Sequence, residues 1–241
     1  MPTAPQSTAT QRAAAWFVHA FTLSGLAWAT LATLALIEGD YTAMWLWLGV
    51  ALVVDSVDGT MARKARVKEV LPWFDGGIVD IAVDYLTWTF IPALFMYLAL
   101  PLGPKPLALA LVILILVSSM FCYANQHWKS SDYYFVGFPA AWNIVAVFMY
   151  VMGTGATFNV IAVLVLALLT LTPTYYTHPF RVKRFMAVNI AAITLWLAAT
   201  AYLVALAPER PLWALIAFWV TGGWFALTCA WRTIAGTDQR Q

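Results

Sequence analysis

The stretch AAAWFVHAFTLSGLAWATLATLALI, residues 13–37, decides the class of fold. It carries no charged residue and is longer than the ~20 apolar residues that a helix needs to cross the hydrocarbon core of a bilayer. A cleaved secretory signal has a shorter apolar core, so we expect a retained first membrane helix. Composition agrees, since 63% of the residues are hydrophobic and only 10% are charged. A soluble domain carries about 25% charged residues, so a water-soluble fold is excluded.

Seven further spans follow from the other charge-free stretches of the 241-residue chain. Residues 133–180 contain no Asp, Glu, Lys or Arg, and they are long enough for two spans that meet at the turn 153–155. The sequence therefore predicts an all-α integral membrane protein with about eight transmembrane helices, formed as one membrane domain over residues 1–241. The remaining predicted spans cover residues 41–54, 85–104, 106–128, 185–208 and 211–231.

Basic residues indicate which side of the membrane each loop faces, because Lys and Arg concentrate in cytoplasmic loops. Eight spans place both termini on one side, together with the loops after the second, fourth and sixth helices. Of the 13 Lys and Arg residues, only Lys105 and Arg210 fall on the opposite side. Both termini are therefore predicted to be cytoplasmic. The basic residues on that side are Arg12, Arg63, Lys64, Arg66, Lys68, Lys129, Arg181, Lys183, Arg184, Arg232 and Arg240.

The small net charge of +2 argues against nucleic-acid binding. The two cysteines, Cys122 and Cys229, both lie in apolar stretches, and the three histidines are isolated from one another. This pattern predicts neither a disulfide framework nor a zinc site.

Four acidic residues follow helical spacing at the predicted membrane ends. Asp55 and Asp58 are three positions apart and Asp80 and Asp84 are four apart, so each pair shares one face of a helix. Ionisable groups in a membrane segment are costly, and they usually face a cavity and serve a function. Four converging carboxylates repel one another and need cations between them. Carboxylate oxygens favour hard ions, which points to Mg²⁺ or Mn²⁺.

Helix capping or ion pairing with the basic residues at 63–68 would explain either pair alone about as well as a metal site does. The two pairs together, beside that basic loop, favour the metal site. Glu69 and Asp75 fall outside both helical faces, so for these two residues we favour capping or ion pairing.

The segment DSVDGTMARKARVKEVLPWFDGGIVDIAVD, residues 55–84, resembles the signature of the CDP-alcohol phosphatidyltransferases. That signature reads D-x-x-D-G-x-x-A-R, a gap, then G-x-x-x-D-x-x-x-D. The gap here is longer than is usual in the family, a feature that resembles its bacterial phosphatidylcholine synthase branch. So do the stretches VHAFTLSG, FVGFPAAWN and THPFRVKR. The fixed positions of the signature are filled by Asp55, Asp58, Gly59, Ala62, Arg63, Gly76, Asp80 and Asp84.

The resemblance implies a role for each of these residues. Asp55, Asp58 and Asp80 would bind metal, and Asp84 would bind metal and act as general base on the acceptor hydroxyl. The resemblance further implies two Mn²⁺ or Mg²⁺ ions, CDP-diacylglycerol and choline as substrates, a homodimer, and a bacterial inner membrane with the active site facing the cytoplasm. The CDP site would be lined by Asp58, Gly59, Ala62, Arg63 and Gly76.

Choline carries a fixed positive charge that proteins commonly hold against aromatic faces. Rings cluster near the predicted cytoplasmic loops, and we expect some of them to form the acceptor pocket. Ordinary packing in the interfacial aromatic belt is the alternative for each ring. The candidate choline-binding residues are Tyr123, Tyr133, Tyr134, Trp142, Asn143 and Tyr176.

Two other functions stay open on the sequence alone. A serine acceptor would make the chain a phosphatidylserine synthase, and Arg181, Lys183 or Arg184 would then meet the serine carboxylate. A cation-coupled transporter would also bury carboxylates. Transporters often show internal repeats and broken helices near the midplane, whereas no repeat is evident here and the Asp pairs lie near helix ends.

Overall fold

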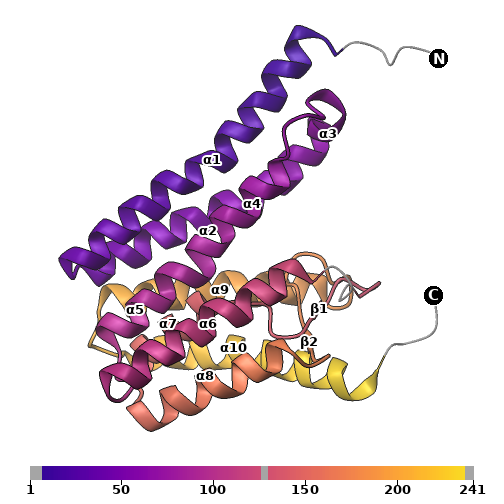
Figure 1. Ribbon diagram of the computed structural model, residues 1–241. Helices are drawn as coiled ribbons and strands as arrows, with labels where there is room; N and C mark the ends of the chain where they lie inside the picture. Colours follow the sequence, from indigo (N-terminus) through magenta and orange to yellow (C-terminus); the bar gives the residue numbers. More distant parts are fainter. Residues whose placement is uncertain (1–6, 126–129, 237–241) are drawn as a thin grey trace. The chain divides into compact units, whose positions relative to one another are not determined.

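The computed structural model describes residues 7–125 and 130–236, and these residues are mostly helical (Figure 1). Among them, six helices are long and apolar enough to cross a membrane. The prediction of a helical multi-pass membrane protein is therefore confirmed. The six spans are α1 (Ala9–Glu38), α2 (Tyr41–Lys64), the continuous helix Gly76–Ala99, α6 (Lys105–Ala124), α9 (Met186–Ala205) and α10 (Leu212–Ala235).

The stretch 133–180 forms two helices, as predicted, but both are short. α7 (Trp142–Met152) has 11 residues and α8 (Ala156–Thr170) has 15, so at 1.5 Å per residue neither reaches the ~30 Å of a hydrocarbon core. The turn between them is where the sequence predicts it, because Gly153 ends α7 with φ +57°. The flanking residues form two short antiparallel strands, β1 (Phe135–Val136) and β2 (Tyr175–Tyr176), which pair Phe135 with Tyr176.

The acidic segment is more helical than the hydropathy pattern predicts. We expected the span over residues 41–54 to continue into the acidic motif, and α2 does continue, as far as Lys64. The span expected over residues 85–104 is part of a longer helix, because α4 (Gly76–Asp84) begins at Gly76, in keeping with the helical spacing of Asp80 and Asp84. Charge-free stretches mark the hydrocarbon core, whereas a helix continues until its backbone is capped. The side chain of Asp75 caps α4 by accepting from the Gly77 N–H at 2.9 Å.

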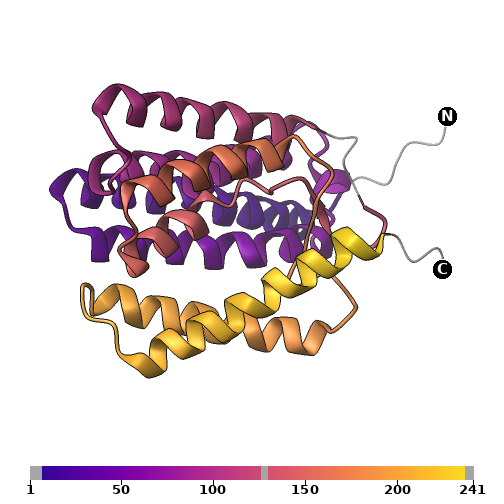
Figure 2. The same cartoon turned by 90° about the horizontal axis from the view of Figure 1, so that it is seen from below.

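The chain forms two compact units, Met1–Thr87 and Trp88–Gln241. In the first unit, α1 packs along α2 and α4 and also meets the short helix α3 (Val67–Val70). In the second, α9 packs on α10 (Figure 2), α6 on α8, and α5 (Ile91–Ala99) on α6 and α7. Fully buried Trp142 and Phe95 lie in the core of this second unit.

The span Gly76–Ala99 contains a π-helical turn, η1 (Tyr85–Phe90), directly after Asp84. Pro92 follows it near the start of α5. Proline lacks the N–H that would bond to the carbonyl four residues earlier, and its ring crowds that carbonyl, so the helix widens here. The acidic pair on α4 thus lies just before an irregularity of a kind that often accompanies functional sites.

The turn between α7 and α8 meets other loops of the second unit. The Asn159 side chain donates to the Pro101 carbonyl at 2.9 Å, and Pro101 lies between α5 and α6. The Arg210 guanidinium, from the loop between α9 and α10, lies so close to Gly153 that a Cβ there would be 2.3 Å from Arg210 Nη2. Three interhelical connections therefore meet at one end of this unit.

Close approach of α1 and α4 depends on Gly25. A Cβ at this position would lie 2.4 Å from Val83 Cγ1, and both residues are buried. We predict that Gly25→Ala destabilises the protein by about 1–3 kcal/mol through overpacking, measured as a lower Tm of the purified protein in detergent. Gly49→Ala is the matched control, since nothing lies within 4 Å of a Cβ there. Adding Val83→Ala should restore the stability, and equal Tm values for all variants would contradict this packing.

Candidate metal centre

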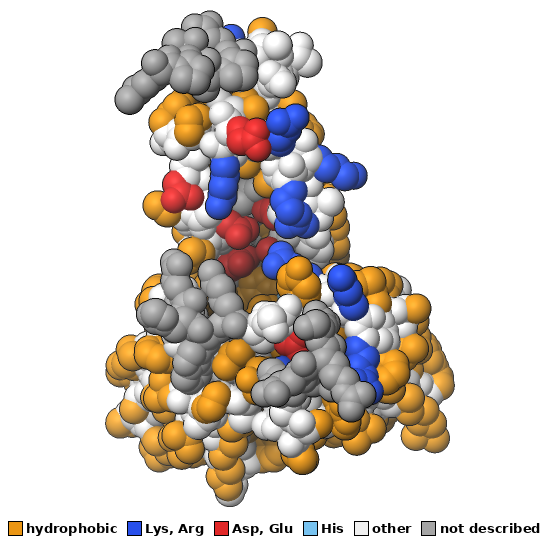
Figure 3. Space-filling view, turned by 90° about the vertical axis from the view of Figure 1, so that its right-hand side faces the viewer, with side chains coloured by type: hydrophobic (Ala, Val, Ile, Leu, Met, Phe, Trp, Pro, Cys, Tyr) orange, Lys and Arg blue, Asp and Glu red, His pale blue; other side chains and the backbone are white. Residues whose placement is uncertain are grey.

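Three carboxylates from two helices of the first unit converge. Asp55 on α2 and Asp80 and Asp84 on α4 each offer an oxygen, and these three oxygens lie within 4.8 Å of one another. In the space-filling view, several acidic (red) side chains gather on one face with basic (blue) side chains beside them (Figure 3). Helical spacing thus predicted which residues share a face, and packing of α1 against both α2 and α4 holds the two faces in one unit.

Electrostatics makes this cluster a candidate cation site. Two unit charges 4.8 Å apart repel by roughly 3 kcal/mol at an effective dielectric constant of about 20. The charges of Asp55 and Asp80 repel that of Asp84, and so does the charge of Asp58. A divalent cation among these carboxylates would neutralise two of the charges.

Asp84 also carries an unsatisfied atom. Its Oδ1 is buried and has no hydrogen-bond partner among the described residues. A buried carboxylate oxygen without a partner costs about 1–3 kcal/mol or more, so it marks a place where a ligand or ion belongs. An all-oxygen set of this kind suits Mg²⁺ or Mn²⁺, and the residues present therefore fit such an ion.

Asp58 differs from the other three predicted metal ligands. It is only 6% exposed, its Oδ2 accepts from the Thr22 hydroxyl at 2.8 Å, and it lies outside the trio of converging oxygens. Thr22 belongs to α1, so the first helix holds part of the acidic motif in place. In the sequence, the one sign of this role is a polar side chain within an apolar helix.

The glycines of the motif serve different purposes. The His19 ring of α1 packs against Gly76, where a Cβ would come within 2.7 Å of the ring. His19 is 3% exposed and also contacts Phe74, with ring centroids 4.5 Å apart. At Gly59 a Cβ would meet only the Arg63 side chain, at 3.4 Å. Gly76 thus admits a neighbouring helix, whereas the surface at Gly59 stays open.

The other motif residues lie at the end of α2. Arg63 is exposed, and its guanidinium donates to the Thr60 hydroxyl at 2.9 Å. Ala62 packs beside a small apolar cluster that includes Ala15 of α1. Arg63 is therefore available to a ligand, and Ala62 contributes to the joint between α1 and α2.

Two acidic residues behave as capping and pairing groups, as we predicted. Asp75 caps α4, and Glu69 pairs with Arg66 at 3.2 Å on the exposed surface. Both interactions lie outside the converging trio.

The residues predicted to bind choline all lie in the second unit. Trp142 is fully buried, and its Nε1 donates to Ser119 at 2.8 Å, so it supports the core. Asn143 accepts from the Ile144 N–H at 2.8 Å. Tyr123, on α6, is partly buried.

The loop tyrosines are held in different ways. Tyr133 is 53% exposed, whereas Tyr134 is buried. The Tyr176 hydroxyl accepts from Thr174 at 3.3 Å. His178 stands nearby on the same loop, and its Nδ1 accepts from the Phe180 N–H at 3.2 Å.

Together, the spans and the acidic centre define a multi-pass membrane protein with a carboxylate site at the ends of its helices. The chain matches no known protein-family profile. It is 49% identical to a phosphatidylcholine synthase of Pseudomonas aeruginosa over 97% of this chain and 98% of that one. It is 40% identical to a phosphatidylcholine synthase of Agrobacterium fabrum over 86% of each, and 39% identical to one of Rhizobium johnstonii over 87% and 86%. The chain belongs to the phosphatidylcholine synthase family.

The bond between Thr22 and Asp58 gives a stability prediction. Thr22→Val keeps the shape but removes the donor, which leaves the buried Asp58 oxygen without its partner. We expect a loss of about 1–3 kcal/mol, measured by thermal unfolding in detergent, and a much smaller loss for Thr22→Ser. Thr30→Val is the control, because that exposed hydroxyl bonds to the Leu26 carbonyl of its own helix. Equal stability of Thr22→Val and wild type would show that the bond contributes nothing.

Proposed function

We propose that this protein transfers the phosphatidyl group of CDP-diacylglycerol to choline and releases CMP. Its relationship to phosphatidylcholine synthases over nearly its whole length supports the reaction. The observation that supports the location of the chemistry is the convergence of Asp55, Asp80 and Asp84, with a buried oxygen of Asp84 unsatisfied. The alternatives of a serine acceptor and of a cation-coupled transporter receive no comparable support.

The acidic centre would hold Mn²⁺ or Mg²⁺, in our proposal two ions, through Asp55, Asp58, Asp80 and Asp84. When bound, the metal stabilises negative charge on the diphosphate oxygens during displacement. The Thr22 hydroxyl keeps Asp58 oriented. Exposed Arg63 binds the diphosphate, and Gly59 leaves room for the nucleotide beside it.

Asp84 is proposed as the general base. The choline oxygen attacks the phosphorus that carries the diacylglycerol, its proton passes to Asp84, and the bond from that phosphorus to the CMP oxygen breaks. A choline hydroxyl is a poor nucleophile, so a positioned base increases the rate by about 10²–10⁴-fold. The buried, unpartnered Oδ1 of Asp84 is an acceptor suited to that proton.

We further propose eight membrane crossings with both termini and the active site facing the cytoplasm, in a bacterial inner membrane. A crossing by the short helices α7 and α8 is supported by two contacts between loops that we predict to lie on the same side of the membrane. These contacts join Gly153 with Arg210 and Asn159 with Pro101. β1, β2 and their neighbours would complete each crossing as irregular backbone buried in protein, which a membrane tolerates. Lys129 and Arg240, which contribute to the charge asymmetry, lie outside the described residues.

Three further features complete the proposal. They are a single membrane domain over residues 1–241, a homodimer, and a choline pocket drawn from the aromatic candidates. For the pocket, replacement of Tyr123, Tyr133, Tyr134 or Tyr176 by Ala should raise the KM for choline. The role of Trp142 and Asn143 would be to support that pocket.

One assay tests the reaction and the base together. Purified protein with CDP-diacylglycerol, Mn²⁺ and radiolabelled choline should yield labelled phosphatidylcholine and CMP, while labelled serine yields no lipid. Asp84→Asn should lower turnover by at least about 10²-fold while binding of the CDP-lipid persists. The matched control is Asp75→Asn, which changes a capping residue outside the trio. Absence of CMP release with choline would contradict the proposed reaction, and full activity of Asp84→Asn would reject Asp84 as the base.

A further inference from the structure

A second cluster of charged and aromatic groups lies in the second unit, where the loop before β1 meets β2 and the end of α10. We call it the Arg232 cage; its members are Asp132, Tyr134, Tyr175 and Arg232. Arg232 Nε donates to Asp132 Oδ2 at 2.8 Å. The guanidinium carbon lies 4.0 Å from the ring centroid of Tyr175 and 5.3 Å from that of Tyr134. One carboxylate and two aromatic rings thus surround one cation.

The cage satisfies the charge of Arg232 but not its hydrogen bonds. The side chain is 2% exposed, and both Nη1 and Nη2 are buried without a partner among the described residues. A guanidinium has five N–H donors, and burying them unpaired is costly. The Oδ1 of Asp132 is likewise buried and unpartnered within the described part of the chain. The surroundings therefore offer negative charge and aromatic faces, but few acceptors for an N–H group.

This combination matches a cation that donates no hydrogen bonds. A quaternary ammonium group is such a cation, and aromatic faces beside an acid are the usual means of recognising it. We propose that Asp132, Tyr134 and Tyr175 form a binding site for a quaternary ammonium group, and that the Arg232 side chain occupies this site until the ligand displaces it. The choice of choline as ligand rests on the proposed function, whereas the site itself follows from the geometry.

Neighbouring contacts hold the cage together when its occupant leaves. The Thr233 hydroxyl accepts from the Tyr175 N–H at 2.9 Å, which fixes β2 to α10. Ser130 donates to the Tyr134 carbonyl at 2.8 Å. These bonds hold the backbone of both tyrosines independently of Arg232.

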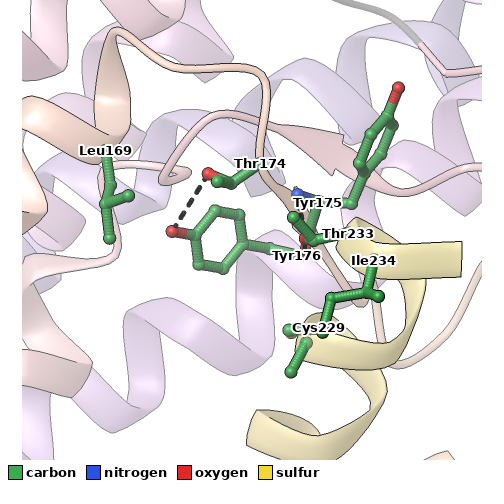
Figure 4. A pocket seen from close by; sticks show the side chains of 8 residues that line it. Leu169, Thr174, Tyr175, Tyr176, Cys229, Thr233 and Ile234 are labelled. Carbon is green, nitrogen blue, oxygen red and sulfur yellow. Dashed lines mark hydrogen bonds between the residues drawn. The ribbon is translucent and has the colours of Figure 1, made fainter. Parts of the chain in front are cut away.

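A cavity of about 330 Å³ adjoins the cage, and Tyr175 lines it (Figure 4). Its lining also includes polar groups from β2 and α10, and the Tyr176 hydroxyl there is bonded to Thr174. The lining residues are Leu169, Thr174, Tyr175, Tyr176, Cys229, Ala230, Thr233 and Ile234.

Equilibrium binding of radiolabelled choline to the full-length purified protein, without CDP-lipid, tests the site. Arg232→Met keeps an unbranched side chain but removes the charge, so choline should bind about tenfold tighter or more once the competing occupant is gone. Tyr175→Leu should weaken binding about tenfold, whereas Tyr175→Phe should retain it because the aromatic face remains. Tyr202→Leu on α9 is the matched control, since that ring packs against Trp213 outside the cage.

The arms of the experiment separate the possible ligands. Competition by tetramethylammonium but not by ammonium supports a quaternary-ammonium site. Stronger competition by glycerophosphocholine than by choline would assign the site to a phosphatidylcholine headgroup in place of the free alcohol. Unchanged choline binding in Tyr175→Leu, with Tyr202→Leu also unchanged, would overturn the proposal even if Arg232→Met fails to fold. If the Tyr175→Leu variant still synthesises phosphatidylcholine with the wild-type KM for choline, the proposed function stays intact. If the protein binds choline at the cage but releases no CMP, only the proposed function is refuted.

Discussion

Repulsion among Asp55, Asp80 and Asp84 is the constraint on which the first unit depends. Their oxygens lie within 4.8 Å of one another, in a chain in which only 10% of the residues are charged. The surrounding packing brings them together at this cost: Gly25 lets α4 approach α1, Gly76 admits the His19 ring, and Thr22 holds Asp58. Carboxylates held this closely could bind a metal ion, which would relieve their repulsion.

The second unit buries a positive charge, whereas the first brings negative charges together. Arg232 is a buried cation that is held within the protein by one carboxylate and two tyrosine rings. Around it, β1, β2 and their flanking residues replace regular helix, and backbone of this kind is tolerated at membrane depth where protein buries it or a cavity adjoins it. Each unit thus has a charged centre: converging carboxylates that could hold a cation in the first, and a buried arginine paired with a carboxylate in the second.

Much of this organisation could be predicted from sequence, because charge-free length and helical spacing are local properties. The stretch 13–37 identifies the membrane class, and the spacing of Asp80 and Asp84 places them on one helix face. What sequence could not provide depends on contacts between distant segments. The bond from Thr22 to Asp58 and the pairing of Phe135 with Tyr176 each join residues that lie far apart in the sequence.

Direct titration of Mn²⁺ tests the central claim that the converging carboxylates form a metal centre. Electron paramagnetic resonance reports free Mn²⁺, so its loss on addition of purified protein measures binding. We predict saturable binding by the wild type and by Asp75→Asn, and an affinity at least about tenfold lower for the Asp55→Asn, Asp80→Asn double variant. Mn²⁺ binding of equal strength by the folded double variant would contradict a metal centre at these carboxylates.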